Sequence, residues 1–325
     1  MKDESVCVLV VTYNRVNTLL KTLQGIMNQN KKINGIFIFN NNSSDNTEKE
    51  LRDRGFIKRN EEISANKLYS TSLKGIRIHY YYNETNLGGA GGFAKGIGMV
   101  SKLNYNYLWI MDDDVFPEPD CLEIIRKEMV RNDALVGIPN RTDDNFVDKA
   151  CVDIDFSDYH KFWTEMRKSK IEGPFNKDAI IVNDMPFEGP VIDMKLVRKV
   201  GIPDSGFFIE YDDSDYAQRL QKYSKIVFAT RACLHRQLAK KTNAMNKVKK
   251  PYNWRNYYKI RNNIVFDKRY GENYKVKYLS PLILILHHIY LSLKDHHLKA
   301  NLPIILKAYY DGVMGKMGKR VDPDY

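Results

Sequence analysis

Short apolar runs alternate with helix-like segments through the first part of the chain. Residues 6–11 are apolar throughout and rich in valine, which predicts a strand buried on both faces. Apolar residues at helical spacing follow from Leu19 to Met27, with Asn17 as a capping residue. Further strands are predicted at 36–39, 77–82, 107–111, 134–139 and 226–234, and a helix at 118–131. Strands that alternate with helices predict an α/β fold with a mainly parallel sheet.

Three other segments have less regular patterns. Residues 54–73 are charged and predict a loop, and residues 140–178 fit no single pattern. Residues 207–209 predict a short strand, and the acids that follow are typical of the first turn of a helix.

Composition is that of a soluble globular protein, with 43% hydrophobic and 28% charged residues. The four cysteines, at 7, 121, 151 and 233, are widely spaced and match no zinc or redox pattern, which favours a cytoplasmic protein. Because the chain runs from Met1 almost directly into a strand, we expect no signal peptide.

Positive charge is concentrated in the last quarter of the chain. Residues 236–325 contain 19 Lys and Arg against 6 Asp and Glu, and the whole chain has a net charge of +11. This asymmetry indicates an anionic partner, either nucleic acid or an anionic membrane surface. We expect one domain at 1–240 and a basic, mostly helical region at 241–325.

An apolar run at 279–293 lies between lysines in this basic region. It is too short and too interrupted for us to expect a membrane span. It predicts an interfacial helix on a membrane, a helix that packs on another subunit in a homo-oligomer, or a core helix. The positive charge favours the membrane surface, and we expect no nucleic acid partner.

Four polar clusters follow the ends of predicted strands, at 12–15, 40–45, 86–92 and 112–114. In parallel sheets, ligands bind beyond the carboxyl ends of the strands. Because all four clusters fall at such ends, the sequence predicts one polar site at one edge of the sheet.

Three adjacent aspartates end the apolar run 107–111. Side chains alternate along an extended backbone, so Asp112 and Asp114 are expected on one side and Asp113 on the other. Two carboxylates on one side suit a hard cation such as Mg²⁺ or Mn²⁺, which would in turn hold a diphosphate. The alternative is a solvated acidic turn that precedes the next helix.

A glycine cluster at 88–92 follows another predicted strand. Its spacing partly matches a dinucleotide-binding fingerprint, but that fingerprint belongs after the first strand of its unit. Glycines also let the backbone approach a ligand closely and direct N–H groups at an anion. The alternative is a tight turn packed on the sheet.

Together these motifs resemble the inverting glycosyltransferases of family 2, which have the GT-A fold. Within that family the chain is most similar to bacterial galactofuranosyltransferases, with rhamnosyltransferases as close relatives. The resemblance covers residues 5–265, and one departure is Asn40, where the family often has an acid that contacts the nucleotide base. The motifs that carry it are Thr12-Tyr13-Asn14-Arg15, Asn41-x-Ser43-x-Asp45-x-Thr47, Asn86-x-Gly88-Gly89-x-Gly91-Gly92-Phe93, Asp112-Asp113-Asp114, Phe207-Phe208-Ile209-Glu210-Tyr211-Asp212-Asp213 and His235.

The resemblance also implies roles for individual residues. Asp213 would be the catalytic base, with Asp212 and Glu210 placing the acceptor hydroxyls, and Phe187 and Glu188 would face the acceptor. The implied metal ligands, for Mn²⁺ or Mg²⁺, are Asp112, Asp114 and His235. The implied nucleotide-sugar site comprises Thr12, Tyr13, Asn14, Arg15, Asn41, Asn86, Gly88, Gly89, Gly91 and Asp113.

The implied function is metal-dependent transfer of a sugar onto a hydroxyl of a growing cell-surface glycan. The expected donor is UDP-galactofuranose, the expected acceptor is lipid-linked, and the expected location is the inner face of the plasma membrane. Alternatives are a dTDP-rhamnose-dependent rhamnosyltransferase, a nucleotidyltransferase, and a non-catalytic protein that binds glycans or nucleic acid through its basic region.

Overall fold

The computed structural model describes residues 4–143, 145–146, 149–238 and 250–323. The expected domain boundary at 240 lies outside these residues. The strands are β1 (Val6–Thr12), β2 (Gly35–Asn40), β3 (Leu68–Leu73), β4 (Ile76–Tyr82), β5 (Tyr107–Asp112), β6 (Val115–Pro117), β7 (Val136–Arg141), β8 (Ala150–Ile154), β9 (Lys168–Ile171), β10 (Ala179–Val182), β11 (Val191–Asp193) and β12 (Ile226–Arg236).

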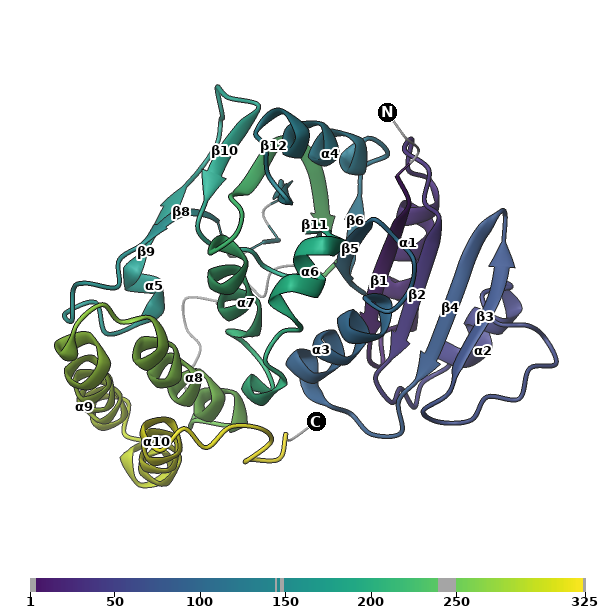
Figure 1. The fold of residues 1–325 in the computed structure, drawn as a ribbon. Helices are drawn as coiled ribbons and strands as arrows, with labels where there is room; N and C mark the ends of the chain where they lie inside the picture. The colour runs from purple at the N-terminus through teal and green to yellow at the C-terminus, as the bar shows by residue number, and fades with distance from the viewer. Residues whose placement is uncertain (1–3, 144, 147–148, 239–249, 324–325) are drawn as a thin grey trace.

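Helices connect most of these strands and form the end of the chain (Figure 1). They are α1 (Val16–Met27), α2 (Thr47–Asp53), α3 (Gly88–Val100), α4 (Cys121–Arg131), α5 (Thr164–Arg167), α6 (Met194–Val200), the 3-10 helix η1 (Ser205–Phe207), α7 (Asp212–Gln221), α8 (Trp254–Tyr270), the π-helical segment η2 (Lys275–Leu279), α9 (Ser280–Lys294) and α10 (Leu298–Val313).

Within the described residues, ten strands form one sheet in the order β10-β12-β7-β11-β5-β1-β2-β4-β3, with β6 paired to β12. Strands β5, β1, β2 and β4 are parallel neighbours, as are β7 and β12. Strand β11 joins the two groups by antiparallel pairing with β5 and β7. The predicted α/β class is confirmed, with antiparallel pairing at this junction and at the edges.

Both faces of the sheet are covered, which explains why β1 is apolar throughout. Val8 and Val10 pack on the side of α1 and α4, whereas Leu9 and Val11 pack on the side of α3, α6 and α7. Every residue of β1 is buried. A strand covered on both faces needs apolar side chains in both directions, which gives a continuous run rather than alternation.

Two predictions in the less regular segments are wrong. The expected loop at 54–73 contains β3, which pairs antiparallel with β4. Most side chains of β3 are exposed or half-buried, so its sequence carries little apolar signal. The expected strand at 207–209 is instead the end of η1 and a tight turn, because Phe208 has a φ of 67°.

The C-terminal helices pack around their own apolar core (Figure 1). Tyr258 and Ile264 of α8, Leu284 of α9 and Ile305 of α10 belong to this core. Among the described residues, the helix Lys275–Lys294 is long and apolar enough to cross a membrane, with 33% of the segment buried. Because η2 extends α9 by one turn, this helix is longer than the apolar run 279–293, and it includes Lys275, Lys277 and Lys294.

Candidate active site

The carboxyl ends of four neighbouring parallel strands, β5, β1, β2 and β4, bring the polar clusters to one edge of the sheet, as predicted. In register, Thr12 lies beside Asn40, and Val11 lies beside Asp112. The loops after β1 and β2 are also hydrogen-bonded, since Ser44 N donates to Asn14 Oδ1 at 2.7 Å. Asn14 has a φ of 52°, a left-handed conformation that asparagine tolerates better than most residues.

The loop after β1 contacts the aspartate triad directly. Thr12 Oγ1 donates to Asp113 Oδ2 at 2.8 Å, and Tyr13 N donates to the same oxygen at 3.3 Å. Arg15 Nη1 lies 3.2 Å from Asp113 Oδ1 and 3.0 Å from Asp114 Oδ2. Burial raises the pKa of Asp113 to about 6, although Arg15 and Thr12 act in the opposite direction.

The predicted alternation of the three aspartates is wrong in one respect. Asp113 and Asp114 share Arg15 instead of facing opposite ways. Strand β5 ends at Asp112 and the next two residues form a turn, so the two-residue period stops there. Asp114 is 1% exposed and Asp113 4% exposed, so the triad is no solvated acidic turn.

Two carboxylates of the triad have properties that fit a cation. Asp114 Oδ1 is buried and has no hydrogen-bond partner among the described residues. Burial and the neighbouring Asp114 and Glu188 raise the pKa of Asp112 well above its usual value. A divalent cation between Asp112 and Asp114 would satisfy the unpaired oxygen and neutralise this repulsion.

His235 does not complete the predicted three-residue metal site. Its Nε2 lies 2.9 Å from Glu118 Oε1, and its Nδ1 lies 3.6 Å from Asp143 Oδ2. The next residue, Arg236, contacts Asp114 instead, with Nη2 3.5 Å from Oδ2. Neighbouring side chains of β12 point in different directions, and among the described residues no three His, Cys, Asp or Glu side chains gather to hold a metal.

Asn41 and Asn86 organise the start of the glycine-rich helix α3. Asn41 Nδ2 donates to Asn86 Oδ1 at 3.1 Å and to Gly88 O at 3.0 Å. Asn86 Oδ1 also accepts from Gly88 N at 2.8 Å. Asn40, the departure from the family pattern, is 1% exposed and donates through Nδ2 to Tyr80 Oη at 2.9 Å.

The glycines allow a close contact between α3 and the turn that precedes α7. Gly88 has a φ of +74°, and a Cβ there would lie 2.4 Å from Phe208 O. The same oxygen accepts from Ala90 N at 3.1 Å. A Cβ at Gly91 would lie 2.6 Å from Leu87 Cβ, whereas Gly89 has open space around it. Gly88 and Gly91 are therefore required for packing, and Gly89 is the one open to a ligand.

The segment from Phe208 to Tyr211 is a strained turn, here called the catalytic turn. Phe208, Glu210 and Tyr211 have φ values of 67°, 62° and 72°. Such conformations are unfavourable for non-glycine residues and persist only where the surroundings hold them. The turn delivers Asp212 and Asp213 to the first positions of α7.

Helix α8 supplies the groups that hold this turn. Asn262 Nδ2 donates to the carbonyl oxygens of Phe207 at 3.1 Å, Ile209 at 2.7 Å and Glu210 at 3.0 Å. Arg261 Nη2 donates to Phe207 O at 2.7 Å. Both side chains are fully buried. The sequence does not single these two residues out, because polar residues in a basic region are typical of an exposed surface.

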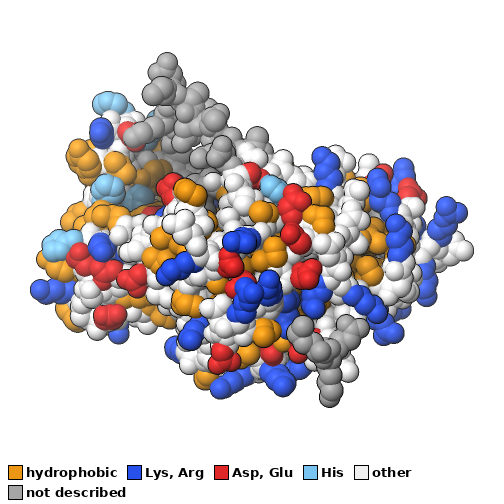
Figure 2. Space-filling view, turned by 90° about the horizontal axis from the view of Figure 1, so that it is seen from above, with side chains coloured by type: hydrophobic (Ala, Val, Ile, Leu, Met, Phe, Trp, Pro, Cys, Tyr) orange, Lys and Arg blue, Asp and Glu red, His pale blue; other side chains and the backbone are white. Residues whose placement is uncertain are grey.

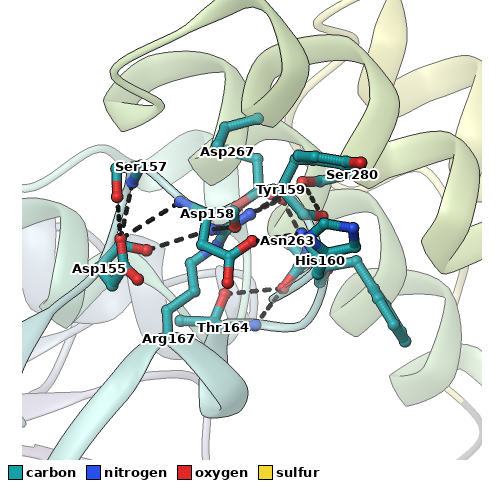
Figure 3. Close-up of polar contacts among 12 residues, drawn as sticks. Asp155, Ser157, Asp158, Tyr159, His160, Thr164, Arg167, Asn263, Asp267 and Ser280 are labelled. Carbon is teal, nitrogen blue, oxygen red and sulfur yellow. Dashed lines mark hydrogen bonds and ion pairs between the residues drawn. The ribbon is translucent and has the colours of Figure 1, made fainter.

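The hairpin β8–β9 and helix α5 are fixed to α8 by a buried ion pair (Figure 3). Arg167 Nε lies 3.1 Å from Asp267 Oδ1, and Arg167 Nη2 donates to Ser280 Oγ at 3.1 Å. Asn263 Oδ1 accepts from Thr164 Oγ1 at 2.7 Å. Burial raises the pKa of Asp267 to about 7, with Arg167 opposing this.

A cavity of about 1080 Å³ opens beside the catalytic turn. Asp213 and Glu210 line it, as does Lys259 from α8, whose Nζ lies 3.8 Å from Glu210 Oε1. Trp163 and Tyr211 add aromatic surface. Aromatic rings combined with carboxylates suit a polyhydroxylated ligand such as a sugar.

Among the described residues, Phe187 and Glu188 do not line this cavity, although Pro186 of the same loop does. Phe187 is 4% exposed and packs against Phe93 with the rings tilted, their centroids 4.9 Å apart. Glu188 pairs with Arg141 at 2.8 Å and with Arg236 at 3.8 Å. Because Arg236 also contacts Asp114, Glu188 connects the aspartate triad to Arg141 on the cavity wall.

The two carboxylates at the start of α7 both bind protons more tightly than usual. Burial, with Asp215 and Glu210 adding repulsion, raises the pKa of Asp212 to about 7. Burial, Asp212 and Asp184 raise the pKa of Asp213 well above its usual value, while Lys168 lowers it. Carboxylates shifted in this way are candidates for proton transfer.

The fold and the site together define a sugar-nucleotide transferase of the GT-A type. The defining features are polar loops at the carboxyl edge of the sheet, the aspartate triad and the carboxylate pair at the start of α7. Residues 7–181 match the family model described as Glycosyl transferase family 2, so the chain belongs to this family. Family members are nucleotide-sugar-dependent glycosyltransferases.

Among curated proteins, the chain is similar to Galactofuranosyltransferase GlfT1 of Mycolicibacterium smegmatis. The identity is 30% over 114 residues, which are 35% of this chain and 31% of that protein. The match thus spans about a third of the relative's length.

Solved structures share the fold at low sequence identity. TarS of S. aureus in complex with UDP-GlcNAc has a TM-score of 0.55 at 12% identity, covering 95% of this chain and 81% of that one. Mannosyltransferase PcManGT of Pyrobaculum calidifontis, in complex with GDP-Man and Mn²⁺, has a TM-score of 0.55 at 12% identity, covering 96% and 87%. These similarities establish a GT-A-like fold.

Proposed function

We propose that this protein is a metal-dependent inverting glycosyltransferase that moves a sugar from a nucleotide donor onto an acceptor hydroxyl. The observation that carries this proposal is the placement of Asp213, which lines a large cavity from the end of a strained, firmly held turn. The edge of the sheet with Asp112 to Asp114 forms the donor side, and the cavity forms the acceptor side.

In this proposal each side of the site has a separate task. Asp213 takes the proton of the acceptor hydroxyl while the hydroxyl oxygen attacks the anomeric carbon of the donor sugar. The bond between that carbon and the nucleotide diphosphate breaks in the same step. Asp112 and Asp114 would hold the divalent cation, which neutralises charge on the departing diphosphate. Thr12, Arg15 and the loop at Asn41 bound the nucleotide pocket.

The proposed donor is UDP-galactofuranose. It is supported by the 30% identity to Galactofuranosyltransferase GlfT1, in a match that includes only part of either protein. dTDP-rhamnose is the alternative donor in a test with several nucleotide sugars. The acceptor we propose is a hydroxyl of a cell-surface glycan, whose sugar rings would stack on Trp163 and Tyr211 in the cavity.

We place the enzyme in the cytoplasm, on the inner face of the plasma membrane. Exposed apolar side chains line one side of η2 and α9 at spacings of three and four residues, which makes a continuous stripe on a helix. The stripe consists of Tyr274, Tyr278, Leu282, Leu286, Tyr290 and Leu293. Figure 2 shows apolar side chains among Lys, His, Asp and Glu at the end of the molecule where α9 lies in Figure 1. An apolar stripe in a basic region suits an anionic lipid surface, where a lipid-linked acceptor would be found.

The test is turnover with a panel of nucleotide sugars, detected as released nucleoside diphosphate, with Asp213→Asn as the matched variant. The amide has nearly the shape of the carboxylate, so folding and donor binding should survive. It cannot take the hydroxyl proton, so turnover should fall by something like 10²–10⁴-fold.

Asp212→Asn is the control, because Asp212 lies at the buried end of the pair and would position rather than deprotonate. Near-normal turnover of Asp213→Asn with saturating acceptor would assign the base elsewhere. No diphosphate release from any nucleotide sugar would reject the proposed function.

A further inference from the structure

One wall of the acceptor cavity carries an ion pair next to the proposed base. Lys168 Nζ lies 2.7 Å from Asp184 Oδ2, and both side chains are mostly buried, at 13% and 11% exposure. Lys168 is the first residue of β9, Asp184 follows β10, and Asp213 belongs to α7. All three line the same cavity although they are far apart in sequence.

Ser214 contacts the base and lines the same cavity as the ion pair. Ser214 N donates to Asp213 Oδ1 at 2.7 Å. Asp184 Oδ1 also accepts from Met185 N at 3.0 Å. Asp184 therefore contacts Lys168 directly and lines the same cavity as Asp213 and Ser214.

Lys168 is held firmly where it lies. The preceding residue, Arg167, is fixed by the buried ion pair with Asp267 that Figure 3 shows. Glu165 adds a second carboxylate 3.5 Å from Lys168. Although burial opposes its charge, Asp184 and Glu165 raise the pKa of Lys168, so it carries its proton at neutral pH.

We propose that Lys168 and Asp184 are positioning residues that set the charge state of Asp213: Lys168 favours its carboxylate form, and Asp184 limits that effect. This inference rests on the proposed function, in which Asp213 is the base. A base must be ionised before the hydroxyl arrives, yet it must bind a proton well during transfer. A cation balanced by a fixed anion gives both properties.

Opposite effects on the base follow from removing either partner. Lys168 lowers the pKa of Asp213 and Asp184 raises it. Other charged groups on this side of the cavity are carboxylates and lysines from the catalytic turn, α5, α7, α8 and β9. They are Glu165, Lys170, Glu210, Asp212 and Lys259, and the rest of the cavity is also lined by Arg141, Asp143, Lys149, Glu172 and Arg231.

The experiment is the pH profile of kcat/KM with the nucleotide sugar that the panel identifies. Lys168→Met should move the acidic limb to higher pH by roughly one unit, so the loss is large at low pH and recovers as pH rises. Asp184→Asn should move the limb to lower pH. Lys168→Arg, which keeps the charge, should stay near the wild-type profile.

Lys161→Met is the matched control, because Lys161 pairs with Asp155 at 2.7 Å on the same segment and does not line the cavity. If the ion pair is merely structural, both variants should lose activity equally at every pH, or their acidic limbs should shift in the same direction. Either result overturns the inference. Suppose that turnover depends on Asp213 but the acidic limb of Lys168→Met stays where the wild-type limb lies. That result would reject this inference alone and leave the proposed function unaffected.

Discussion

At the scale of single residues, the aspartates of the triad differ in their contacts. Asp113 is occupied by Thr12, Tyr13 and Arg15, whereas Asp114 keeps one buried oxygen without a partner. The sequence predicted the triad as a cation site from its position after a strand. It did not predict how the side chains are shared, because the strand ends at Asp112 and the alternation ends with it.

We expect Asp114→Ala to abolish Mn²⁺ binding in the presence of UDP, because the cation loses a charged oxygen ligand. In the wild type, Mn²⁺ affinity should rise with pH. Burial raises the pKa of Asp113 to about 6 and that of Asp112 well above its usual value, so protons compete with the metal at lower pH. Calorimetric titration with Mn²⁺ at two pH values measures both effects.

His235→Ala provides the comparison, since its imidazole contacts Glu118 and Asp143. Mn²⁺ affinity should change little in this variant. A loss equal to that of Asp114→Ala would show that His235 turns toward the metal when the donor binds, and unchanged affinity in Asp114→Ala would remove the triad from the metal site.

At the scale of elements, apolar periodicity predicted the central strands and failed where packing, not pattern, sets the conformation. β1, β2 and β5 are continuous apolar runs because both faces of the sheet are covered. The catalytic turn also looks apolar, yet it takes left-handed φ values imposed by carbonyl contacts with α8. No local pattern encodes a contact between residues 52 to 55 positions apart.

We expect Asn262→Ala to lower kcat strongly while donor binding is retained. The variant leaves the carbonyl groups of Ile209 and Glu210 without this donor, whereas Phe207 O keeps its bond from Arg261. This loss should cost about 1–3 kcal/mol of stability and loosen the position of Asp213. Thermal unfolding and steady-state kinetics with varied donor measure the two effects.

Asn256→Ala, in the same helix, is the matched control. Asn256 Oδ1 accepts from Asn253 N in a capping box at the start of α8, away from the residues that bind the turn, so its loss should lower stability and leave kcat unchanged. If both variants lower kcat in proportion to stability, α8 supports the fold and does not position the base.

At the scale of the whole molecule, the basic C-terminal region has two opposite sides. One side of α8 holds the catalytic turn, and the exposed side of α9 carries the apolar stripe. Composition predicted the positive charge and the helices, but not that buried polar residues of α8 complete the site. We therefore expect surface association and catalysis to be separable in this region.

The double variant Leu282→Asp and Leu286→Asp should bind anionic vesicles more weakly than the wild type, because it places charge in the apolar stripe, at residues 43% and 57% exposed. Turnover of a soluble acceptor should be unchanged, since neither residue lines the cavity. Wild-type binding to vesicles of mixed neutral and anionic lipid should also fall with added salt, as screening requires.

Co-sedimentation measures binding, and Val130→Asp, at an apolar residue 64% exposed on α4, is the matched control. Salt-insensitive binding would indicate insertion driven by apolar area alone. If the wild type is a dimer, the double variant is a monomer and neither protein binds vesicles, the stripe contacts a second copy of the chain.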